Sequence, residues 1–203
     1  MVAKKKASAL TVKRIRAMHR EYFHGLGRFV DRFSQTEQDM AWIMFMLCGV
    51  SFDDAQALFS GVRMDEAMNN IRKLAEIRQI ADAPKELLSE AFTQLRQISE
   101  LRNSLLHYGA SFDASSKERT TSNRLRSRNI KSFTVSADGF LRLYHDLEKV
   151  EAHVSAALSG VIPSRTWGDP HGELLRRAWL YRFRQPKSKG KQNPNNQARQ
   201  HPP

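Results

Sequence analysis

Three residues near the middle of the chain, Arg102, Asn103 and His107, have side chains that could bind a phosphate and move a proton. A guanidinium carries a permanent positive charge and can bind a phosphate through two parallel hydrogen bonds, stabilising charge that develops there. An imidazole titrates near neutral pH and can accept or donate the proton of a hydroxyl or of a leaving group. The asparagine amide, one turn before the histidine, is suited to orient the ring or the phosphate. We take these three as candidate catalytic residues.

The three residues lie near the end of a segment, about 85–108, that the sequence predicts to be one long helix. The triplet 82–84, Asp-Ala-Pro, indicates its start, because proline fits the first turn of a helix. On a helical projection the apolar residues of the segment form one face, and Arg102 lies inside that face, while Asn103 and His107 share another. A charged residue within an apolar arc must pair with an acid, reach solvent or face an interface.

The string ISELRNSLLHYGA, residues 98–110, resembles the signature of HEPN domains. In that signature an arginine, four to six intervening residues and a histidine lie near the end of a long helix. The resemblance covers about residues 28–160 and implies an all-α fold, an antiparallel bundle of four to five helices. It also implies a metal-independent endoribonuclease in which two copies of the motif meet across the groove of a homodimer. Arg102 and His107 would then cleave RNA and leave a cyclic phosphate end.

Candidate substrate-binding residues follow the motif directly. Tyr108 is adjacent to the histidine, and the basic stretch 113–131, expected to be a loop or an irregular hairpin, contains Arg124, Arg126 and Arg128. The resemblance points to a role in defence, in stress response or as a toxin. Such a role would add a cognate antitoxin or a regulatory protein to RNA as a partner, and no cofactor or metal ion is expected.

The same residues also allow a non-catalytic interpretation. Arg102 could be a structural arginine that pairs with an acid such as Glu37 of an earlier helix, with His107 serving only to cap the helix end. The chain would then be an HEPN-like module that binds RNA, a nucleotide or a protein partner without cutting. The two alternatives stay open at the level of sequence.

The net charge of +12 suggests a nucleic-acid partner, but its distribution is uneven. Residues 1–20 contain seven Lys and Arg and no acid, and residues 176–203 contain eight and no acid. The remaining 18 basic and 21 acidic residues leave 21–175 mildly acidic. Cys48 is the only cysteine, which excludes an intramolecular disulfide. With neither a signal-peptide pattern nor an apolar stretch of membrane-spanning length, we expect a cytoplasmic protein with no membrane association.

We expect four parts along the chain: a basic N-terminal extension (1–19), an HEPN-like helical bundle (20–160), a docking segment (161–184) and a disordered basic tail (185–203). Within the first two, residues 1–7 are expected to be disordered, and Gly25 and Gly27 to interrupt or kink a helix. The remaining local signals predict further features. They are a capping box at 34–37, with a longer helix from about residue 20 as its alternative, helix starts at Ser51 and Ser136, and a short strand over 133–135. On the last helix, Asp146, Glu148 and Glu151 are expected to form a solvated face.

Overall fold

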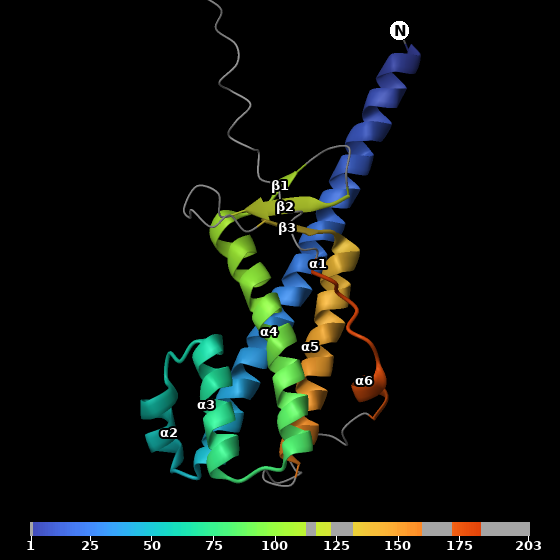
Figure 1. Cartoon of the computed structure of the whole chain (residues 1–203). Helices are drawn as coiled ribbons and strands as arrows, with labels where there is room; N and C mark the ends of the chain where they lie inside the picture. Colours follow the sequence, from blue (N-terminus) through green and yellow to red (C-terminus); the bar gives the residue numbers. More distant parts are fainter. Residues whose placement is uncertain (1, 113–116, 123–131, 160–171, 184–203) are drawn as a thin grey trace, which may run out of the picture.

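The computed structural model describes residues 2–112, 117–122, 132–159 and 172–183. Within these ranges the chain is predominantly helical, as the sequence predicts, with six helices and one three-stranded sheet (Figure 1). The sixth helix is a five-residue segment in the C-terminal part, which accounts for the excess over the expected four or five. The helices are α1 (Val2–Cys48), α2 (Phe52–Phe59), α3 (Met64–Ile77), α4 (Asp82–Tyr108), α5 (Ala137–Leu158) and α6 (Gly172–Arg176).

Helix α1 is one continuous helix, about 70 Å long at the usual rise per residue. The prediction that residues 1–7 are disordered is therefore wrong for Val2 onward, and the expected boundary after residue 19 falls inside this helix. The interruption expected at Gly25 and Gly27 is also absent. Gly25 instead allows close packing, because a Cβ at this position would lie 3.3 Å from the backbone oxygen of Ala137 at the start of α5.

The capping box expected at residues 34–37 lies in the interior of α1, so the alternative of a longer helix is the one observed. The Ser34 hydroxyl donates to the Val30 carbonyl oxygen at 3.1 Å, and the Thr36 hydroxyl donates to that of Arg32 at 3.0 Å. Both hydroxyls are thus satisfied within the helix. The helix continues through them because its apolar face continues, with Phe29 and Phe33 fully buried before the motif.

Other local signals are confirmed. Ser51 caps α2, where its hydroxyl oxygen accepts the N–H of Asp54 at 3.2 Å. Ser136 caps α5 in the same way, accepting the N–H of Gly139 at 3.1 Å. Helix α4 begins at Asp82, as the Asp-Ala-Pro triplet predicts.

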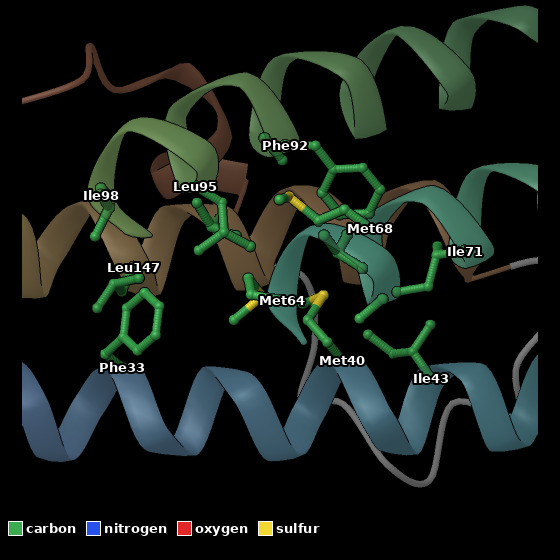
Figure 2. Packing of buried hydrophobic residues seen from close by; sticks show 14 of the residues in the cluster. Phe33, Met40, Ile43, Met64, Met68, Ile71, Phe92, Leu95, Ile98 and Leu147 are labelled. Atoms are coloured by element: carbon green, nitrogen blue, oxygen red, sulfur yellow. The ribbon is translucent and has the colours of Figure 1, made fainter. Parts of the chain in front are cut away.

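The core lies where three long helices pack side by side, with α4 running in the opposite direction to α1 and α5 (Figure 1). Helix α3 covers the lower part of the same core against α1 and α4. Figure 2 shows how the side chains of four helices meet there. The buried residues labelled in it are Phe33, Met40 and Ile43 of α1, Met64, Met68 and Ile71 of α3, Phe92, Leu95 and Ile98 of α4, and Leu147 of α5.

An antiparallel sheet of three short strands lies at the C-terminal end of α4, in the order β1 (Ser111–Phe112), β2 (Arg119–Ser122) and β3 (Ser132–Val135). Strand β3 confirms the strand expected over 133–135. The strands pair with Ser111 opposite Thr120 and Thr120 opposite Thr134. The Thr121 hydroxyl donates to the Ser104 carbonyl oxygen at 2.9 Å, which attaches the sheet to the end of α4.

Within the expected docking segment (161–184), residues 177–183 dock on the body, and residues 161–171 lie outside the described residues. Trp179, Tyr181 and Phe183 pack against the core, and the Tyr181 hydroxyl donates to the Thr134 carbonyl oxygen of β3 at 2.9 Å. We call residues 177–183 the C-terminal strap. The expected disordered tail, 185–203, lies outside the described residues.

Candidate functional site at the end of helix α4

The end of α4 positions all three candidate catalytic residues. One face of this helix is buried from Leu88 to Leu105, which fixes its rotation against α1 and α5. Gly109 ends the helix with a positive φ of 65°, a backbone conformation that glycine adopts readily, and its N–H donates to the Leu105 carbonyl oxygen at 3.1 Å. His107 therefore lies in the last turn, next to the negative end of the helix dipole.

Arg102 is turned toward α1 and is only partly exposed. Its guanidinium lies 5.1 Å from the centre of the Phe33 ring, and one terminal nitrogen lies 3.6 Å from a carboxylate oxygen of Glu37. The other terminal nitrogen donates to the Asn103 side-chain oxygen at 3.0 Å. The buried Nε has no hydrogen-bond partner among the described residues. The structure thus contains the Arg102–Glu37 pair that the non-catalytic interpretation requires.

Asn103 and His107 are both exposed. The His107 ring meets only the edge of the Tyr108 ring, with 6.4 Å between centroids, among the aromatic contacts of the described residues. Five residues along an α-helix correspond to a rotation of about 140° from one side chain to the other and to a rise of about 7.5 Å. Arg102 and His107 of one chain therefore point to different sides of α4, while Arg102 and Asn103 touch.

The substrate-binding candidates divide into two groups. Tyr108 is described and is 40% exposed, beside His107 at the end of α4. Arg124, Arg126 and Arg128 lie outside the described residues.

Phe33, which sequence reasoning missed, supports the Arg102 guanidinium from α1. Its position one helical turn before Glu37 was the signal that could have identified it.

A second polar cluster lies under the C-terminal strap, where the sequence predicted a solvated face. That prediction is wrong for Asp146, because its exposed fraction is only 1%, the same as that of His153 on the same helix. The Asp146 carboxylate accepts the backbone N–H groups of Leu180 at 2.7 Å and Tyr181 at 2.9 Å, and the side-chain amide of Gln94 at 3.1 Å. Burial raises the pKa of Asp146, and these hydrogen bonds oppose the increase.

Trp179 and Lys149 make further polar and aromatic contacts between the strap and the helices beneath it. The Trp179 ring lies 4.4 Å from the Lys149 ammonium, and its indole N–H donates to a Glu90 carboxylate oxygen at 2.8 Å. Lys149 donates to the carbonyl oxygen of Arg177. Burial lowers the pKa of His153, and the nearby Lys149 charge acts in the same direction. These polar groups contact the strap or one another, so we interpret the cluster as the surface that holds the strap in place.

A carboxyl pair joins α1 to α5 on another side of α1. Burial raises the pKa of Asp39 to about 7, and the hydrogen bond and the charge of Glu151 add to the effect, while Arg32 opposes it. Arg32 forms an ion pair with Glu151. The two carboxyl groups thus share their environment with one arginine, and a proton on Asp39 relieves the repulsion between them.

Among the described residues, no helix combines the length and the hydrophobicity needed to span a bilayer. Comparison with models of protein families, with curated proteins and with solved structures found no match to this chain.

Proposed function

We propose that this chain is an HEPN-like helical bundle that cleaves RNA without a metal ion, with Arg102, Asn103 and His107 as its catalytic residues. The observation that carries the proposal is that the Arg102 guanidinium is held in a fixed position and is still partly exposed to solvent. It is held at the end of a long helix by an aromatic ring and by the Asn103 side chain, and 24% of its side chain stays exposed. An arginine prepared in this way can bind a phosphate.

The Glu37 pair is compatible with this role. At 3.6 Å, with partly exposed side chains on both partners, the pair contributes only about 0–1 kcal/mol. A phosphate that binds the guanidinium through two hydrogen bonds provides a stronger interaction. RNA would therefore replace Glu37 at Arg102, and Phe33 and Asn103 would keep the guanidinium in position.

The different directions of Arg102 and His107 support a composite site between two copies. In this site the guanidinium of one copy binds the scissile phosphate and the imidazole of the second copy takes the proton of the 2′-hydroxyl. The 2′-oxygen forms a bond to phosphorus as the bond to the 5′-oxygen breaks. The leaving oxygen receives a proton from water, and the products are a cyclic phosphate end and a free 5′-hydroxyl. We further propose a role in defence, in stress response or as a toxin.

Cleavage of total RNA and of tRNA in the presence of EDTA tests the proposal. We expect cleavage by the wild type and a loss of about 100-fold or more in Arg102→Ala and in His107→Ala, with helicity retained by circular dichroism. Arg96→Ala and His145→Ala are matched controls, because Arg96 of α4 forms a partly exposed ion pair with Asp65 and His145 of α5 contacts the Glu148 carboxylate at 2.7 Å. Cleavage that persists in both site variants would refute the assignment.

Mixing the two inactive variants tests the composite site. A mixed dimer of Arg102→Ala with His107→Ala contains one site in which both the arginine and the histidine are intact. Mixing should therefore restore part of the cleavage if the residues come from different copies. No recovery, in mixtures shown by native mass spectrometry to contain mixed dimers, would place both residues of a site in one copy.

The Arg102–Glu37 pair favours a second candidate, a non-catalytic HEPN-like module that binds RNA, a nucleotide or a protein partner. In that case Arg102 links α4 to α1 and His107 caps the helix. The wild type would then leave RNA intact in the same assay while still binding it in a filter assay, and Arg102→Ala would change stability more than binding.

A further inference from the structure

The first part of α1 carries positive charge along one exposed face. Lys13, Arg16 and Arg20 are three to four residues apart, so they follow one line along the helix, and all three are exposed. No acidic residue occurs before Glu21. Figure 1 shows this part of α1 extending past the sheet and past the start of α5. Like charges at this spacing destabilise a helix, so this face is suited to a polyanion.

An exposed aromatic ring lies beside the charged line. Phe23 is 56% exposed and follows Arg16 by seven residues, which places the two side chains on the same side of α1. The Phe23 ring is fixed from behind, because it meets the edge of the Tyr22 ring at 5.6 Å and the Arg119 guanidinium lies 4.9 Å from its centre. A fixed and accessible ring beside a line of cations is the combination that binds single-stranded nucleic acid, through base stacking and phosphate contacts.

An anionic membrane surface fits this face less well. A helix that binds a membrane must bury a continuous apolar face. In this part of α1 the apolar side is already covered by the body, with Tyr22 buried and Ile15 and Met18 partly buried. The exposed apolar residues Val12 and Phe23 are about three turns apart and form no continuous patch.

The charged face belongs to the same end of the molecule as the candidate catalytic residues. Arg119 of β2 stacks on the Tyr22 ring of α1 at 3.9 Å and also contacts Phe23. Two residues later in the same strand, Thr121 is hydrogen-bonded to the Ser104 carbonyl oxygen of α4. Strand β2 therefore connects the charged face to the turn of α4 that carries Arg102 and Asn103.

We propose that the face of α1 from Lys13 to Phe23 binds single-stranded RNA. Lys13, Arg16 and Arg20 bind backbone phosphates over about 10 Å of helix, and Phe23 stacks on a base. That the polyanion is RNA rests on the proposed function. The positive charge and the exposed ring are observed in the structure and do not depend on that proposal. The surface acts before chemistry, by holding the strand at the end of the molecule that carries Arg102 and His107.

Binding is measured by fluorescence anisotropy with a labelled oligouridine of about 20 nucleotides, longer than the usual site on one protein module. The full chain carries His107→Ala in every sample, so that the probe stays intact. In this background the triple variant Lys13→Gln, Arg16→Gln, Arg20→Gln should bind at least tenfold more weakly. Because three phosphate contacts are lost, the slope of log affinity against log salt should fall by about 2.

Phe23 is tested separately from the charges. Phe23→Leu should lower the affinity about tenfold and leave the salt slope unchanged, because stacking is lost while the phosphate contacts remain. Phe23→Tyr keeps the ring and should bind like the parent. The matched aromatic control is Phe52→Leu, since Phe52 is 61% exposed on α2, at the opposite end of the molecule.

A second control removes charge elsewhere. The variant Arg63→Gln, Lys73→Gln, Lys85→Gln loses the same charge from α3, from its N-cap and from the first turn of α4, far from the sheet, and should bind like the parent (Figure 1). Exchange of the three α1 residues for the other basic type, Lys13→Arg with Arg16→Lys and Arg20→Lys, should also retain binding. Equal losses in both triple Gln variants would overturn the proposal, since net charge alone would then explain binding.

Two further outcomes would also overturn it. One is unchanged RNA binding by the α1 triple variant. The other is binding to phosphatidylserine vesicles, or only to duplex DNA, without binding to the RNA probe. RNA binding through α1 by a protein whose wild type does not cleave would refute the proposed function and leave this inference standing. If cleavage is lost in the site variants but RNA binding does not depend on α1, the proposed function stands and the inference about α1 is refuted.

Discussion

The guanidinium of Arg102 lies 3.6 Å from the carboxylate of Glu37 and connects the C-terminal part of α4 to the C-terminal part of α1. The pair is partly exposed on both sides, and the Phe33 ring lies against the same guanidinium. These two contacts make Arg102 both a structural link and a cation that a phosphate can reach. The balance between the two roles can be measured through stability.

Arg102→Ala should lower the free energy of unfolding by about 1–2 kcal/mol, from a partly exposed ion pair and a cation–π contact. A fully buried pair would cost about 3–5 kcal/mol. Urea unfolding followed by circular dichroism gives the value. Arg96→Ala is the matched control on α4, because Arg96 also lies 3.6 Å from an acid, Asp65, but is more exposed. A loss of 3 kcal/mol or more in Arg102→Ala alone would assign Arg102 to the core.

The C-terminal strap should depend on Asp146. Asp146→Ala removes the acceptor of the Leu180 and Tyr181 N–H groups and should destabilise the protein by about 3 kcal/mol, since hydrogen bonds to a buried charge are strong. Trypsin should then cut after Arg177 faster than in the wild type. Glu148→Ala, on the same helix, removes only a partly exposed pair with His145 and should leave that rate unchanged. Equal rates in Asp146→Ala and the wild type would show that other contacts hold the strap.

The carboxyl pair predicts a specific pH dependence. With a folded pKa of about 7, Asp39 keeps its proton across a range in which the unfolded chain, with an ordinary pKa near 4, has released it. The folded state then binds more protons than the unfolded state between about pH 4 and 7. The contribution of Asp39 to stability is therefore present at low pH and is lost as pH rises through this window.

Asp39→Asn cannot ionise, so it should make the stability curve flatter and should be more stable than the wild type at pH 8. The difference should be on the order of 1 kcal/mol, because partial exposure screens the interaction. Urea unfolding at pH 4.5 and pH 8 measures it. Asp31→Asn is the control, since Asp31 is exposed on the same helix. A parallel shift of both variants at both pH values would contradict the prediction.

Two glycines should respond in opposite directions to alanine. At Gly139 a Cβ would lie 2.9 Å from a methyl group of the buried Val135 and 3.3 Å from the Tyr181 ring, so Gly139→Ala should cost about 1–3 kcal/mol. At Gly27 a Cβ would meet nothing within 4 Å, and Gly27→Ala should stabilise the protein by about 0.5–1 kcal/mol, because alanine is the better residue in a helix interior. Thermal unfolding compares the two variants. A destabilised Gly27→Ala would indicate a contact at that position.

Local physical chemistry explains which features could be predicted from the sequence. The caps at Ser51 and Ser136, the end of α4 at Gly109 and the apolar face of α4 depend on neighbours within a few residues. Their hydrogen bonds and their 3.6-residue period are therefore present in the sequence pattern itself. The predominantly helical fold and the position of Arg102 on an apolar face follow from the same patterns.

Only the tertiary structure decided the features that depend on distant partners. The box at 34–37 has the pattern of a helix start, but burial of Phe29 and Phe33 against other helices carries α1 through it. Asp146 has the pattern of a solvated face, and it is buried together with His153 because a strap that begins at least 24 residues later covers them. The contact of Arg102 with Glu37 depends on how α4 and α1 lie in the core, whereas its separation from His107 follows from the helix period alone. Periodicity states which face of a helix is apolar, and it contains no information on which segment will cover that face.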